Sequence, residues 1–127
     1  MAGLDEGVPL FVQIAERLAD EIADGTLAEG EQVPSTNELA AFYRINPATA
    51  AKGISMLTDD GLVEKRRGIG MFVAAGARVR LLAERRKLFA ERYVEPLVAE
   101  AARLGMDANE LVALIRESSH AQGGTRR

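Results

Sequence analysis

Three consecutive cations, at residues 65–67, stand beside a glycine-rich turn at 68–70 in the middle of the chain. The flanking segments 62–66 and 71–73 contain strand-forming residues, so the pattern predicts a β-hairpin with the cations at its tip. Cations gathered on such a tip can neutralise the phosphates of a nucleic acid. A basic run of this kind, taken alone, usually marks a solvated turn, so its role depends on the elements that position it.

The segment directly before the hairpin has the start and stop signals of a helix. Asn46 is a favourable N-cap, and Pro47 suits the first helical position, where its missing N–H costs nothing. The helix is expected to run to Asp60 and to end at Gly61, which can adopt the left-handed conformation. A short helix followed by a basic hairpin is the arrangement of a winged helix, in which the helix enters the major groove and the hairpin contacts the backbone.

The two faces of this helix differ in character. Its apolar face is expected to pack inward and consists of Ala50, Ile54 and Leu57. Because glycine is about 1 kcal/mol worse than alanine in a helix, we expect Gly53 to serve close packing against a neighbouring helix. The outward face carries Ala48, Thr49, Lys52 and Ser55.

Two earlier helices complete the predicted fold. The first is expected between Pro9 and Gly25, because apolar residues recur there at helical spacing. A capping box formed by Ser35 and Glu38 starts the second. The turn at 44–45 leads from this helix into the next, so the pair forms a helix-turn-helix. The residues of the second helix that can face the core are Leu39, Ala40 and either Phe42 or Tyr43.

The region after residue 76 is predicted to be helical and to dimerise. One long helix is expected over 78–104, with a bend at Pro96 because proline removes a hydrogen bond. A last helix is expected from an N-cap at Asp107 to about Ser119. One short helix cannot cover all the apolar side chains of this region, and an exposed apolar stripe marks an interface. The predicted dimer interface is Leu82, Phe89, Tyr93, Leu97, Leu104, Leu111 and Ile115.

These elements predict an α+β fold with two regions. Residues 1–76 form an N-terminal winged helix-turn-helix of three helices and a β-hairpin wing. Residues 77–127 form a short two-helix dimerisation segment. Both ends of the chain, 1–8 and 121–127, are expected to be disordered.

Composition excludes several functional classes. The 127 residues include no cysteine and a single histidine, His120, so disulfides, thiolate metal sites and multi-histidine metal sites are not expected. The chain offers no paired acid–base constellation and no phosphate-binding glycine loop, so we expect neither an enzyme nor a cofactor. The absence of a secretion signal and of a membrane-length apolar run fits a cytoplasmic protein without a membrane partner.

Charge is unevenly distributed along the chain. The net charge is −3, with 6 Lys/Arg against 12 Asp/Glu in residues 1–76 and 10 against 7 in residues 77–127. The predicted DNA-binding region is therefore acidic, and its cations gather near the helix and hairpin described above, which predicts modest non-specific affinity for DNA. A winged helix that binds protein and no DNA remains an alternative, and salt-sensitive binding to a palindromic duplex would separate the two.

A series of short motifs occurs in one order over residues 8–74. The motifs are P-L-F-x-Q-I from Pro9, G-x-x-x-P-S from Gly30, E-L-A from Glu38, N-P-x-T from Asn46, L-x-x-x-G-L-V from Leu57 and R-G-x-G-x-F-V from Arg67. Together they resemble the GntR family of bacterial transcription regulators, and the short helical tail resembles its small YtrA-type branch. The resemblance implies a homodimer that binds an inverted repeat in double-stranded DNA, with repression as the usual mode.

The winged-helix pattern and the resemblance together predict the DNA contacts. Relatives often have an arginine where this chain has Asn37, and some have arginines and threonines at the helix start, where this chain has Pro47, Ala48, Thr49 and Ala51. We therefore expect fewer direct side-chain contacts and more reliance on DNA shape. Arg44 is equally consistent with an ion pair to Glu38. A small-molecule effector would have to bind between the dimer helices, because residues 1–74 leave little spare interior. The predicted DNA-binding residues are Ser35, Thr36, Asn37, Arg44, Asn46, Ala48, Thr49, Lys52, Arg66, Arg67 and Gly68.

Overall fold

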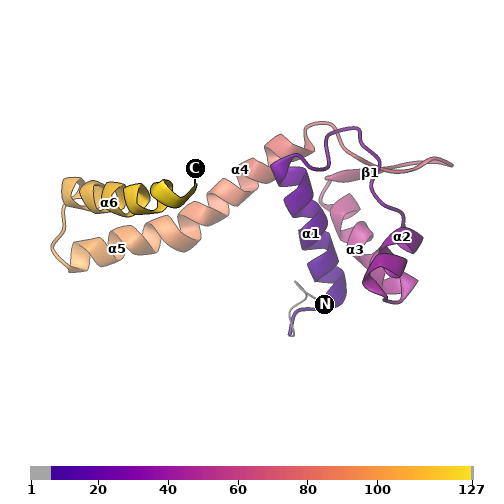
Figure 1. Ribbon diagram of the computed structural model, residues 1–127, viewed down its shortest axis with the longest axis horizontal. Coiled ribbons are helices and arrows are strands. Elements are labelled where there is room, and N and C mark those ends of the chain that lie inside the picture. Colours follow the sequence, from indigo (N-terminus) through magenta and orange to yellow (C-terminus); the bar gives the residue numbers. More distant parts are fainter. Residues whose placement is uncertain (1–6, 127) are drawn as a thin grey trace. The chain divides into compact units, whose positions relative to one another are not determined.

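A computed structural model describes residues 7–126 of the protein, with side chains as far as residue 122 (Figure 1). The expectation of a disordered N-terminus falls almost entirely outside the described residues. The described part has an α+β fold, as predicted. Its elements are α1 (Leu10–Asp24), α2 (Thr36–Tyr43), α3 (Pro47–Asp59), β1 (Val63–Arg66), β2 (Gly70–Val73), α4 (Ala77–Phe89), a π-helical turn (Ala90–Val94), α5 (Glu95–Arg103) and α6 (Ala108–Arg126).

The ends of α1 and α3 follow the local signals in the sequence. Gly25 closes α1 with a left-handed φ of 87°. At the start of α3, the Asn46 Oδ1 atom accepts a hydrogen bond of 2.7 Å from the Ala48 N–H, and Pro47 is the first helical residue. Gly61 follows the cap residue of α3 with a φ of 77°. The predicted ends of these helices are confirmed. They could be predicted because residues adjacent in sequence determine each of them.

Helix α2 begins with the predicted capping box. Ser35 Oγ accepts from the Glu38 N–H at 3.0 Å, and Glu38 Oε1 accepts from the Ser35 N–H at 2.8 Å. Of the two aromatic residues at its end, Tyr43 packs against the core, whereas Phe42 is 68% exposed. Arg44 ends α2 in the left-handed region, with a φ of 56°.

The wing is an antiparallel pair of strands, in which Val63 lies opposite Val73 and Arg66 lies opposite Gly70. The strands lie within one residue of the predicted ones. Gly68 takes a φ of 76°, and the Ile69 N–H donates to the Arg66 carbonyl at 2.9 Å, which closes the turn. The cations therefore stand at the tip of a hairpin, as the sequence predicts.

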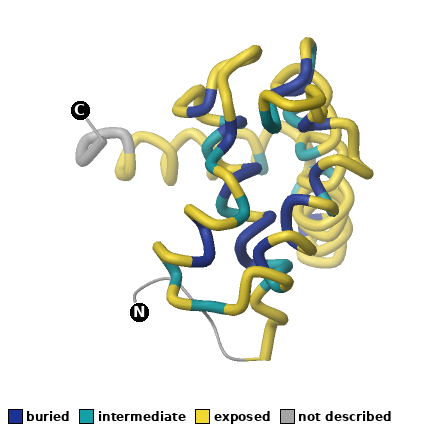
Figure 2. Tube along the Cα trace, turned by 90° about the vertical axis from the view of Figure 1, so that its right-hand side faces the viewer, coloured by how far each residue is buried: buried dark blue, intermediate teal, exposed yellow. Residues whose placement is uncertain are grey.

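The core of the first compact unit lies between α1, α2, α3 and the base of the wing (Figure 2). Ile54 and Leu57 of α3 are buried there with Ala50, so the predicted inward face is confirmed. Its most deeply buried large side chains are Ile14, Ile22, Leu57, Val63 and Val73. One buried cluster thus joins the wing to the helix-turn-helix.

Gly53 is buried where α3 crosses α1. A Cβ atom at this position would lie 2.9 Å from the Phe11 carbonyl oxygen and 3.3 Å from the Ile14 side chain. The expectation that Gly53 serves close packing against another helix is therefore confirmed, and the neighbour is α1.

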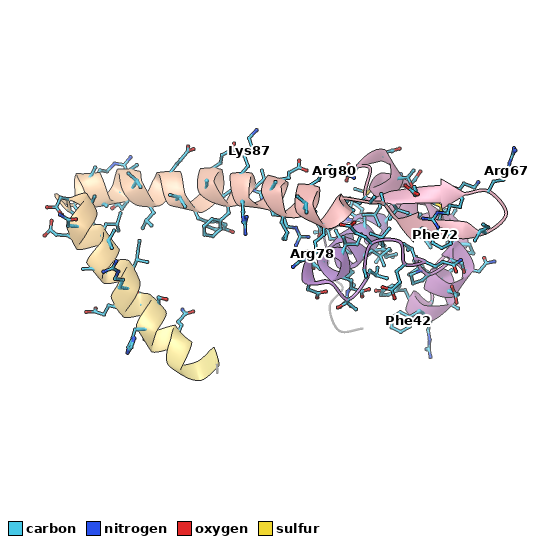
Figure 3. All side chains as sticks on the ribbon, turned by 90° about the horizontal axis from the view of Figure 1, so that it is seen from above. Phe42, Arg67, Phe72, Arg78, Arg80 and Lys87 are labelled. Carbon is cyan, nitrogen blue, oxygen red and sulfur yellow. The ribbon has the colours of Figure 1, made fainter. Side chains whose placement is uncertain are left out.

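The first compact unit extends to Glu84, beyond the boundary at residue 76 that the sequence predicts. Ala77 is fully buried in the core, and Leu81 packs against it. Arg78 Nε donates to the Ala23 carbonyl at 2.8 Å, and the Arg80 guanidinium donates to carbonyls of the loops around it (Figure 3). The first turns of α4 therefore belong to the winged helix, because they complete its core.

The second compact unit begins at Arg85 and is helical. The backbone hydrogen bonds of this helical region change to the π-helical pattern just before Pro96, where the Glu95 N–H donates to the Ala90 carbonyl. Proline cannot donate to the ladder, so a local change in bonding at this position is expected. Gly105 and Asp107 separate α5 from α6 as predicted, and Asp107 Oδ1 caps the Glu110 N–H at 2.8 Å.

The predicted end of the last helix near Ser119 is wrong. Helix α6 continues through His120 to Arg126, and so includes most of the segment 121–127 that was expected to be disordered. No proline or cap residue stops the helix after Ser119, and each glycine lowers helix stability by only about 1 kcal/mol. The small residues of the tail therefore do not end the helix.

We predict that Gly53→Ala lowers the free energy of unfolding by about 1 kcal/mol, because overpacking against the Phe11 carbonyl outweighs the gain in helix propensity. Chemical denaturation at a fixed protein concentration measures the change. Ser55→Ala, at an exposed position of the same helix, is the matched control and should leave the stability nearly unchanged. A Gly53→Ala variant more stable than the parent would contradict the packing account.

Candidate nucleic-acid interface

The first turns of α3 present few free polar groups. Asn46 uses its side-chain oxygen to cap the helix, which leaves the amide N–H groups as its available donors. Ala48 is exposed, and Thr49 is half-buried beside it. The outward face predicted from the sequence is therefore present, although Thr49 is less accessible than its neighbours.

Lys52 is exposed, yet its ammonium group already has a partner. The Nζ atom lies 4.2 Å from the centre of the Phe11 ring on α1. A cation–π contact at an exposed site is worth about 0.5–1 kcal/mol, so a phosphate or a guanine can draw the lysine away at small cost. Lys52 stays a predicted DNA contact.

Polar side chains at the start of α2 are used to cap the helix. Ser35 Oγ and the Glu38 carboxylate hold each other's backbone N–H groups, which leaves Asn37 as the exposed polar side chain of this turn, with Thr36 half-buried. The Glu38 carboxylate accepts from the Ser35 backbone, so the capping box takes the place of the ion pair considered between Glu38 and Arg44. Arg44 is exposed between α2 and α3.

The two arginines of the wing differ in their surroundings. The Arg66 guanidinium lies 4.2 Å from the centre of the Phe72 ring, and its Nε lies 3.6 Å from a carboxylate oxygen of Glu64. Arg67 is exposed next to Gly68 and extends from the tip of the hairpin (Figure 3). Because Arg66 is partly neutralised, Arg67 is better placed than Arg66 to meet a phosphate.

Two features of the wing were not predicted from the sequence. Gln32, in the loop before α2, donates from Nε2 to the Ile69 carbonyl at 3.0 Å. Ile69 itself is 65% exposed at the tip. The two residues are 37 positions apart, and no local pattern marks a loop glutamine as a partner of a distant turn.

Most residues of the predicted dimer interface carry exposed apolar side chains. Leu82 and Leu111 are half-buried, whereas the other five are exposed. The Phe89 and Tyr93 rings lie 5.5 Å apart between centres. The exposed members are Phe89, Tyr93, Leu97, Leu104 and Ile115.

The model of the family "Bacterial regulatory proteins, gntR family" matches residues 10–73. The chain belongs to the GntR family. It is 27% identical over 117 residues to the HTH-type transcriptional repressor YtrA of Bacillus subtilis, a match that covers 91% of this chain and 89% of YtrA. The predicted membership in the family and in its YtrA-type branch is therefore confirmed.

Solved structures agree with this assignment. A GntR-family transcriptional regulator from Bacteroides thetaiotaomicron has a TM-score of 0.72 and 28% identity, over 89% of this chain and 98% of that chain. The DNA-binding domain of AraR, solved in complex with an operator, has a TM-score of 0.52 and 28% identity, over 58% of this chain and 89% of that domain. The winged helix of this GntR-family chain is thus a DNA-binding domain, and the chain is a transcriptional regulator. Within the residues that the structure describes, every helix is too short or too polar to cross a membrane.

We predict that Arg67→Ala weakens binding to all DNA sequences alike, because an exposed cation at the wing tip neutralises a phosphate. The slope of log K against log salt concentration should fall by about one unit, measured by titration of a labelled duplex at several salt concentrations. Arg116→Ala, at an exposed position of α6, is the control. An unchanged slope in a folded Arg67→Ala protein would remove this residue from the interface.

Proposed function

We propose that the protein represses transcription as a homodimer bound to an inverted-repeat operator. One observation carries the proposal: the chain joins a DNA-binding unit to a unit that can dimerise. The first unit has a helix-turn-helix and a cationic wing. The second unit is helical, and its large apolar side chains are exposed. The similarity to YtrA, which is named a transcriptional repressor, extends over most of both chains and supports the same mode of action.

The argument for a dimer rests on the second unit. Of its described side chains, Ala101 alone is classed as buried, while Phe89, Tyr93 and Leu104 are each more than half exposed. Large apolar side chains exposed in this number within one helical unit are uncommon in a soluble monomer and favour an interface. A second copy of the same unit can cover it, since most soluble oligomers are symmetric and a twofold pair uses the same surface on both chains.

A twofold homodimer presents two recognition helices in opposite orientations, which is why we propose an inverted repeat as its target. Repression then follows from occupancy, because a protein bound over a promoter excludes the transcription machinery. The acidic balance of residues 1–76 keeps non-specific affinity modest, so discrimination depends on α3 and on DNA shape. Asn46, Thr49 and Lys52 are the side chains of α3 that we propose for base contact.

We predict that the intact chain sediments as a dimer at micromolar concentration and selects an inverted repeat from a random duplex library. Leu97→Glu places a charge on the exposed apolar surface and should give a folded monomer. Its affinity for the selected duplex should fall by at least about 100-fold, because two linked contacts gain that much over one.

Phe42→Glu is the matched control, since Phe42 is an exposed apolar residue of α2 outside the second unit. This variant should remain dimeric. A wild-type chain that sediments as a monomer, or that selects a single unrepeated site, would contradict the proposal.

A further inference from the structure

The loop before α2 pairs with the wing and forms a third extended segment beside β2. The Val33 N–H donates to the Met71 carbonyl at 2.8 Å, and the Val73 N–H donates to the Glu31 carbonyl at 2.9 Å. Gln32 lies between these two bonds, opposite Phe72. Its position along the wing is therefore fixed by the backbone on both sides.

The side chain of Gln32 reaches from this segment to the wing tip. Its Nε2 atom donates to the Ile69 carbonyl at 3.0 Å, while the Ile69 N–H donates to Arg66 at 2.9 Å. Gly70 has a φ of 139°, and a Cβ atom there would collide with the Gln32 amide. Glycine at this position therefore lets the Gln32 side chain lie directly against the tip, and Ile69 is held through both its N–H and its carbonyl.

This contact determines how the wing presents its cations. Arg66 is already held over Phe72 and near Glu64. Arg67 is exposed at the tip, so the conformation of the tip backbone decides where its side chain starts. A turn that is ordered before binding loses less conformational entropy when it meets DNA. A tip without the Gln32 bond would have to be ordered by the DNA itself.

We propose that Gln32 is a positioning residue for the operator contact of the wing. Its side-chain amide holds residues 66–70 in the conformation that presents Arg67 and Ile69 to DNA. The inference rests on the proposed function, because it requires that the wing bind DNA, and it adds a residue from a loop outside both the recognition helix and the wing.

The test is Gln32→Met, which keeps the length and zero charge of the side chain and removes its N–H donors. The substitution should weaken binding to the duplex selected by the wild-type protein by about two- to tenfold, the range for one hydrogen bond. The salt slope should fall as well, because a loosened tip no longer keeps Arg67 at a phosphate. A general loss of stability would leave that slope unchanged.

The same substitution in an Arg67→Ala background tests whether Gln32 acts by positioning Arg67 or by contacting DNA itself. We expect its effect to shrink there to less than about twofold, since the two residues act through one contact. Trypsin should cleave Gln32→Met faster at residues 65–67 than it cleaves the wild type, at an unchanged melting temperature.

Wild-type affinity and salt slope in Gln32→Met would overturn the proposal, and so would an equal loss of affinity in both backgrounds. Failure of the proposed function looks different. In that case the wild-type protein itself enriches no inverted repeat, whereas the effect of Gln32→Met on tryptic cleavage still reports whether the glutamine holds the tip.

Discussion

The close approach of α3 to α1 at Gly53 is the constraint on which the DNA-binding unit depends. A side chain at this position would meet the Phe11 carbonyl, so the two helices can lie this close only with glycine here. The buried side chains Ile14, Ile54 and Leu57 then fill the space around the contact, and the base of the wing packs on the same cluster. One core thereby fixes the position of the recognition helix relative to the wing. A protein that binds DNA with both elements requires this.

Within that unit, many of the polar side chains that are candidates for DNA contact also stabilise the fold. Ser35 and Asn46 cap helices, Lys52 lies over an aromatic ring, and Arg66 is shared between Phe72 and Glu64. Several side chains that are predicted to contact DNA therefore also end or brace an element. Arg67, at the tip of the wing, is exposed and does not cap or brace an element. This division fits a regulator that makes few direct base contacts and relies on DNA shape and phosphate contacts.

The structural features that were predicted correctly from the sequence are those that neighbouring residues determine. The caps at Ser35 and Asn46, the left-handed glycine at residue 61 and the hairpin at 62–73 all follow from neighbouring residues, and the ordered motifs identified the family. Contacts between distant positions were missed: Gln32 with Ile69, and Arg78 with Ala23, which are 55 positions apart. The burial of Ala77 was not predicted for the same reason, because it depends on the complete core. The DNA and dimer contacts remain predictions.

The central claim is that two winged helices read two half-sites at once, and half-site spacing tests it most directly. Affinity would be measured for the selected duplex, for a duplex with one half-site, and for a duplex with about 5 base pairs inserted between the half-sites, which turns one half-site to the opposite face. The account predicts at least about 100-fold tighter binding to the intact repeat than to one half-site, and loss of that gain on insertion. Equal affinity for all three duplexes would contradict it.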